Sequence, residues 1–170
     1  MKRFFLVATV SLLLANLTFG QEIEYPNSFN EPMQLFPEAM GDFHWEISSD
    51  NELAQEYFNQ GFQLMYAFAK DEAARSFQAS HLADPDCAIC WWGEAWAWGS
   101  YLNGVMTTSQ SPRAYFALQQ ALARIDTATE KEADMIRALE VRYIKAVSYT
   151  HLRAHETPEH LLFRLLLLKK

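Results

Sequence analysis

The chain has 170 residues, half of them hydrophobic and 14% aromatic, with 14 Lys and Arg against 21 Asp and Glu. This length suits a single domain and excludes a large multidomain enzyme. The apolar content lies far above the range of disordered chains. The net charge of −7 disfavours nucleic acids and anionic membranes as partners, because both select proteins with clustered Lys and Arg.

Residues 1–20 have the pattern of a secretory signal peptide. Lys2 and Arg3 precede an apolar run over residues 4–14, and the small residue Gly20 stands before the predicted cleavage point. The run is shorter than the ~20 residues that span a membrane. We therefore expect an exported protein, periplasmic or extracellular, without a stable membrane anchor. The alternative is a buried N-terminal helix.

Residues 147–157 resemble the translated end of a common transposon-based sequencing adapter. Residues 158–170 resemble the index and primer region of that adapter, read in the same frame. We interpret 147–170 as a non-native tail and expect the natural gene to continue beyond residue 146. The alternative is a short C-terminal helix over residues 160–170. Without the tail, residues 21–146 contain eight Lys and Arg against nineteen Asp and Glu, a net charge of −11.

Helical patterns follow a leader over residues 21–50. Prolines interrupt this leader, which has no sustained helical period, so we expect it to lie extended against the first helix. A stripe of apolar and small residues predicts that helix over about residues 51–68. A second helix is expected from Asp71 to a stop at residues 84–86, and a third over about residues 87–98.

Two further helices are predicted after a loop over residues 99–111. Ser111 and Pro112 have the pattern of a helix start, with Ser as the cap and Pro at the first helical position. Thr129 and Glu132 have the spacing of a capping box at the start of the next helix. No alternating segment is long enough for a strand, and the sequence therefore predicts an all-α fold of antiparallel helix pairs.

An internal repeat of 34 residues is the strongest signal in the chain. Tyr57, Gly61 and Leu64 recur as Trp91, Ala95 and Trp98. That period, with small residues where two helices cross and a Pro at the closing turn, is typical of the tetratricopeptide repeat (TPR). We assign residues 51–146 to TPR-like repeats: repeat one over 54–87, repeat two over 88–128 with an inserted loop, and the start of a further helix over 129–146.

The chain also resembles a largely uncharacterised family of exported bacterial TPR proteins. The matching positions are His44, Ser48, Ala54, Gln55, Phe58, Gly61, Glu72, Ala73, Ser76, Phe77, Asp84, Pro85, Cys87, Ala88, Trp92 and Gly93. Family members often have Asn-His before the acid of the second helix, where this chain has Ala69-Lys70. The resemblance covers about residues 40–146. It implies a helical solenoid that binds protein or peptide, with no established catalytic residues.

Cys87 and Cys90 form the one motif with possible chemistry of its own. Haem attachment needs a His at position 91, where this chain has Trp, and a closed zinc site needs two more ligands. Three interpretations stay open: a structural pair (buried thiols or a local disulfide), a redox-active pair, or a metal site completed by His81 or by a ligand further downstream. The first is the main interpretation, and the sequence predicts no resident metal or cofactor.

The other residues give no evidence of catalysis. The acidic residues are scattered, and there is no phosphate loop, dinucleotide fingerprint or Ser-His-Asp arrangement. Four of the five Trp residues lie in one predicted helix, which favours core packing over a ligand cage, whereas we expect Trp45 at the surface.

The sequence therefore predicts a non-enzymatic TPR scaffold or adaptor whose concave side binds a protein or peptide. The first helix of each repeat normally lines that side. The contact candidates, which we expect to be exposed, are Asn59, Gln63, Tyr66, Glu94 and Tyr101. The alternative function is a redox or metal-handling accessory protein that uses Cys87 and Cys90. Two repeats and one extra helix also predict a marginally stable product.

Overall fold

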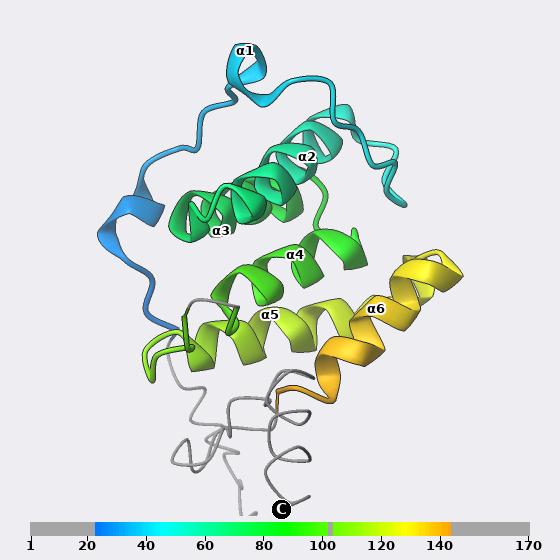
Figure 1. The fold of residues 1–170 in the computed structure, drawn as a ribbon. Helices are drawn as coiled ribbons and strands as arrows, with labels where there is room; N and C mark the ends of the chain where they lie inside the picture. Colours follow the sequence, from blue (N-terminus) through cyan, green and yellow to red (C-terminus); the bar gives the residue numbers. More distant parts are fainter. Residues whose placement is uncertain (1–22, 102–103, 144–170) are drawn as a thin grey trace, which may run out of the picture.

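The computed structural model describes residues 23–101 and 104–143, and the described part is all-α (Figure 1). The α-helices are α1 (Pro37–Met40), α2 (Glu52–Tyr66), α3 (Lys70–Ala83), α4 (Ala88–Trp98), α5 (Ser111–Ala123) and α6 (Glu130–Glu140). Two short 3-10 helices are η1 (Asn27–Asn30) and η2 (Ile125–Thr127). The predicted fold class is confirmed for these residues, whereas the predicted signal peptide and the non-native tail lie outside them.

Local capping signals begin and end most of the helices. The Asn51 side chain accepts a hydrogen bond from the Ala54 N–H at 3.1 Å and caps α2. At α6 the predicted capping box is confirmed, because Thr129 and Glu132 each bind the other's backbone N–H. The predicted cap at Ser111 is wrong. Ser111 is already the first residue of α5, and its buried hydroxyl has no hydrogen-bond partner among the described residues.

The helices from α2 to α5 stack in chain order, each packed on the next (Figure 1). In addition, α2 contacts α4, and α4 contacts α6. Alternate helices therefore lie next to one another and form one surface of the stack. We call this surface the α2–α4–α6 face.

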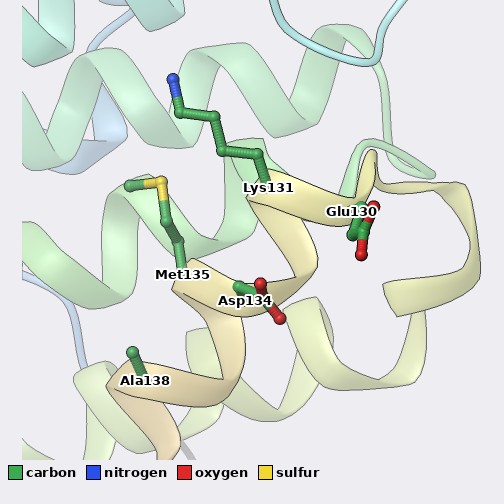
Figure 2. Close-up of a pocket in the computed structure, with 5 residues that line it drawn as sticks. All are labelled: Glu130, Lys131, Asp134, Met135 and Ala138. Carbon is green, nitrogen blue, oxygen red and sulfur yellow. The ribbon is translucent and has the colours of Figure 1, made fainter.

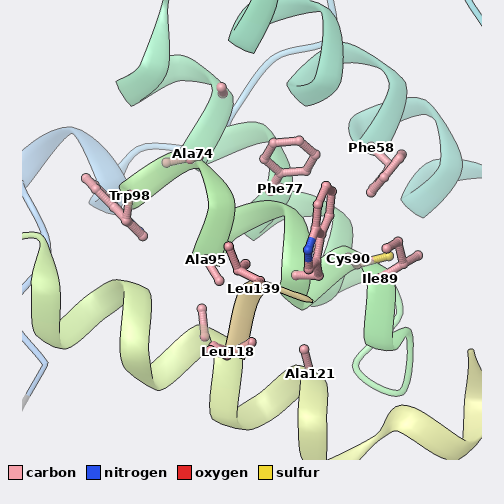
Figure 3. Close-up of a cluster of buried hydrophobic side chains, with 14 of the residues drawn as sticks. Phe58, Ala74, Phe77, Ile89, Cys90, Ala95, Trp98, Leu118, Ala121 and Leu139 are labelled. Carbon is pink, nitrogen blue, oxygen red and sulfur yellow. The ribbon is translucent and has the colours of Figure 1, made fainter. Parts of the chain in front are cut away.

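The core lies between these helices and is centred on large apolar side chains (Figure 3). Phe58 of α2, Phe77 of α3, Ile89 of α4 and Leu118 of α5 are all fully buried. Burial of a side chain of this size stabilises the fold by roughly 1.5–3 kcal/mol. Because one core connects residues from all of these helices, the described part folds around a single hydrophobic centre.

Phe77 packs directly against the backbones of two other helices at glycine positions. A Cβ atom placed on Gly61 of α2 would lie 3.0 Å from the Phe77 ring, and one placed on Gly93 of α4 would lie 2.2 Å from it. The absence of a side chain at these positions lets α2 and α4 approach the same ring. This close approach fixes the spacing of two helices of the α2–α4–α6 face.

The leader, residues 23–50, winds around the outside of the stack rather than leaving it (Figure 1). Its backbone is irregular apart from η1 and α1, but Met33 and Ile47 are buried in the common core. The Tyr57 hydroxyl donates to the Met33 carbonyl at 2.8 Å, and the Gln60 amide bonds the backbone on both sides of Leu35. These contacts hold the leader against α2.

Candidate peptide-binding face

The α2–α4–α6 face holds an extended segment of the chain's own leader, residues 43–48. Gln55 of α2 accepts a hydrogen bond from the Ile47 N–H at 3.0 Å and donates to the Trp45 carbonyl at 2.8 Å. Asn59, one turn further along α2, accepts from the Trp45 N–H at 3.1 Å. Two side-chain amides thus satisfy three backbone groups of an extended chain. Such contacts are independent of the sequence of the bound segment.

The Trp45 side chain enters an aromatic socket made by Phe58, Phe62, Trp92 and Lys131. Its ring centroid lies 5.3 Å from that of Phe58, 5.1 Å from that of Phe62 and 6.4 Å from that of Trp92, all edge to face. The Lys131 ammonium of α6 lies 5.1 Å from the Trp45 ring centroid. Trp45 stays partly exposed, as expected of a residue near the surface, but one side of its ring packs against α2 and α4, with the Lys131 ammonium of α6 over it.

The leader segment ends on α6, the third helix of this face. The Ser48 N–H donates to Glu132 Oε1 at 3.0 Å, while Oε2 of the same carboxylate closes the capping box of α6. Next to this contact, α6 lines an open pocket of about 510 Å³ (Figure 2). The pocket residues are Glu130, Lys131, Asp134, Met135 and Ala138. The segment therefore crosses all three helices and leaves space beside it on α6.

Beyond the socket, four aromatic rings form a second cluster, the aromatic corner, made of Phe43, Phe62, Tyr66 and Trp96. Phe62 lies at its centre, with centroid distances of 5.2 Å to Phe43, 5.3 Å to Tyr66 and 5.4 Å to Trp96. Tyr66 is 71% exposed and Phe43 is 41% exposed. The corner therefore exposes aromatic rings to solvent, whereas the socket is filled by Trp45.

The five predicted contact residues have different positions. Asn59 lies on the face and binds the leader backbone, and Gln63 is half-buried on the same helix. Tyr66 belongs to the aromatic corner, and Tyr101, 37% exposed, lies in the loop after α4. Glu94 is fully buried, so the prediction that it is exposed is wrong.

Glu94 is buried because it joins three polar side chains inside the stack. Its carboxylate lies 2.6 Å from His81 Nε2 and accepts a hydrogen bond from Trp98 Nε1 at 3.0 Å. Burial, together with the charge and a hydrogen bond of Glu94, raises the pKa of the Tyr25 phenol. The Trp91 ring covers His81 at a centroid distance of 3.5 Å. This cluster is enclosed and connects α3, α4 and the leader.

Cys87 and Cys90 form a disulfide at the start of α4, with Cys87 as the helix cap. Both residues are almost completely buried. Of the three sequence interpretations, the structure agrees with a local disulfide in the core. A redox or metal-handling role for the pair stays a prediction, which thiol titration and metal analysis would test.

Lys70 is the first residue of α3. Its ammonium donates to the Gly99 carbonyl and lies 4.3 Å from the Tyr101 ring centroid. Burial lowers the pKa of Lys70 to about 8, against a smaller opposing effect of Asp71. The lysine thus connects the start of α3 to the loop after α4.

Several residues of the face were not among the predicted contacts. Gln55 and Trp45 act through contacts with the leader, which the sequence alone does not reveal. Phe58 and Phe62 recur 34 residues later as Trp92 and Trp96, and this aromatic repetition was the available signal. The sequence favours core packing for the Trp residues of α4, but Trp92 also lines the socket and Trp96 also belongs to the corner.

Comparisons of the chain with known protein families, with curated proteins and with solved structures found no match. Within residues 23–101 and 104–143, no His, Cys, Asp and Glu side chains converge in a group able to hold a metal ion. No helix of this part combines the length and the apolar content that a membrane crossing requires. The contacts on the α2–α4–α6 face are therefore the main evidence for a function.

Proposed function

We propose that the protein is a TPR-like scaffold that binds an extended segment of a partner protein outside the cytoplasm and catalyses no reaction. The 34-residue repeat and the contacts between alternate helices support a repeat architecture of this kind. The signal-peptide pattern of residues 1–20 supports export.

One observation carries the proposal of peptide binding. The α2–α4–α6 face binds residues 43–48 as an extended chain, with side-chain amides on the backbone and an aromatic socket for one side chain. Extended peptides are bound by other proteins with the same combination of backbone hydrogen bonds and side-chain pockets. The leader therefore occupies the position that we propose for a ligand, and its contacts suggest a ligand with an extended backbone and an aromatic side chain.

A peptide selection on the full chain tests this proposal. We would select dodecapeptides from a random library on the wild-type protein, and measure the binding of enriched peptides to wild type, Trp45→Ala and Trp91→Ala. Trp45→Ala empties the socket, whereas Trp91→Ala removes another half-buried Trp that stacks on His81 away from the socket. We expect enriched peptides with an aromatic residue to bind Trp45→Ala more tightly than wild type, and Trp91→Ala no more tightly.

Both substitutions remove packed aromatic surface, so thermal melts must first show that each variant folds. We expect each to be destabilised by about 1–3 kcal/mol, less than for a fully buried aromatic residue. A selection that enriches no peptide contradicts peptide binding. Equal affinities for the two variants contradict binding in the socket.

A further inference from the structure

We infer that the aromatic corner, made of Phe43, Phe62, Tyr66 and Trp96, binds a Lys or Arg side chain, so that the partner segment is a basic peptide. The inference rests on the proposed function, because it names the chemistry of the segment that this face receives. Four observations support it: the exposed rings, two cation–ring contacts within the chain, the ends of two helices and the distribution of charge.

The corner offers ring faces, which attract cations through their electron-rich π-systems. Tyr66 is 71% exposed, and its ring lies 6.4 Å from Trp96, also partly exposed. The chain already makes two such contacts: the Lys131 ammonium lies over Trp45, whose ring contacts Phe62 of the corner, and the Lys70 ammonium lies over Tyr101 in the loop after α4. Aromatic rings of this chain thus hold ammonium groups, one of them next to the corner.

The corner also lies where two helices end. Tyr66 is the last residue of α2, and Trp96 lies in the last turn of α4. The C-terminal end of a helix carries partial negative charge and favours a nearby cation. Neither α2 nor α4 has a basic residue in its last turn. The Lys70 ammonium donates to the carbonyl of Gly99, the C-cap residue of α4, so the end of α4 already has one cation, and the end of α2 at Tyr66 is the more favourable place for a further one.

The charge distribution favours the same ligand. The described residues include eighteen Asp and Glu but only seven Lys and Arg. Five of these seven donate to backbone carbonyls: Lys70, Arg75, Arg113, Arg124 and Arg142. In the described part, Arg137 with Asp134 is the one Lys or Arg ion pair with a carboxylate. Most carboxylates therefore have no basic partner here, and the resulting negative potential attracts a basic segment and repels an acidic one.

The experiment uses the full chain and three synthetic dodecapeptides that differ only at four positions, which are all Lys, all Gln or all Glu. Every peptide carries one Trp for the face. Affinities are measured by calorimetry at low and at physiological salt. We expect the Lys peptide to bind at least about tenfold more tightly than the Glu peptide at low salt, with a smaller ratio as salt screens the charges.

Variants at Tyr66 separate the corner from general charge attraction. Tyr66→Ala should weaken binding of the Lys peptide about three- to tenfold, the range expected when one ring contact is lost. Tyr66→Phe keeps the ring face and should bind as wild type does. Leu82→Ala on α3 is the matched control, because Leu82 is 70% exposed and outside the corner. Its binding should not change.

The outcomes also separate this inference from the proposed function. If the three peptides bind equally well and Tyr66→Ala weakens all of them, the face binds peptides but does not select cations, and the inference is wrong. If the Lys peptide binds best but Tyr66→Ala has no effect, the cation binds elsewhere, and the inference is also wrong. If no peptide binds, both the inference and the proposed function fail.

Discussion

Single residues determine how closely the helices of this stack approach. The Phe77 ring lies against the backbone of α2 at Gly61 and of α4 at Gly93. Both glycines lie inside helices, where Ala is normally more favourable by about 1 kcal/mol. The close contact with a buried aromatic ring outweighs that preference, and the two positions differ in how much space remains.

We predict that Gly93→Ala destabilises the fold, whereas Gly61→Ala changes its stability by less than about 1 kcal/mol. A Cβ at position 93 would lie 2.2 Å from the fully buried Phe77 ring and would force a large shift, and overpacking of this kind costs about 1–3 kcal/mol. At position 61 the distance is 3.0 Å, and the gain in helix propensity offsets a small shift. Urea denaturation of the two variants measures the difference. Equal stabilities would show that Phe77 can move away from α4.

Glu94 shows why single side chains of the face could not all be placed from the sequence. A glutamate between apolar residues of a helix is normally an exposed residue, because burial of its charge is costly. Here His81 and Trp98 provide the compensating contacts. His81 lies on another helix, α3, and no local sequence pattern predicts its contact with Glu94. The burial therefore depends on a tertiary contact with His81 as well as on the contact with Trp98 one turn further along α4.

Whole helices, in contrast, were predicted to within a few residues at most ends. The signals at Asn51, at residues 84–86 and at Thr129 act within one turn of the helix, so the local sequence contains them. The leader was predicted only as an extended chain beside the first helix. Its path depends on Gln55, Asn59 and Gln60 binding backbone groups many residues away, and such contacts leave no periodic pattern.

The Glu132 carboxylate caps its own helix, α6, and also accepts a hydrogen bond from the leader. We predict that Thr129→Ala costs about 1 kcal/mol, the usual effect of losing an N-cap. Glu132→Ala should cost about 2–3 kcal/mol, because it also leaves the Ser48 N–H without its acceptor. Glu130→Ala, an exposed acid in the same first turn, is the control and should cost less than about 1 kcal/mol.

Chemical denaturation of these three variants gives the comparison. Each loses an acid or a hydroxyl from the first turn of α6, so a general effect on the helix would appear in all three. An equal loss in Glu132→Ala and Thr129→Ala would show that the contact with the leader adds nothing to stability.

At the scale of the whole molecule, the leader adds contacts that a simple repeat fold does not have. In a repeat array each unit contacts only its neighbours, so the ends can unfold separately. This leader contacts α2 through Tyr57, α4 through the ring of Trp98, α5 through Arg113 and α6 through Glu132. It therefore connects α2 and α6 in addition to the contacts between neighbouring helices.

We predict that residues 33–48 are protected from hydrogen exchange about as strongly as α2 and open together with it. The Trp45 and Ile47 N–H groups are bound by side chains of α2, so they exchange only when the leader leaves the face. Hydrogen exchange measured by mass spectrometry on the full chain tests this, with the exposed Thr108 and Ser109 of the loop before α5 as the fast-exchanging reference. Leader peptides that exchange as fast as this reference would show that the leader leaves the face in solution. The face would then be available to a partner without the competition that the leader imposes.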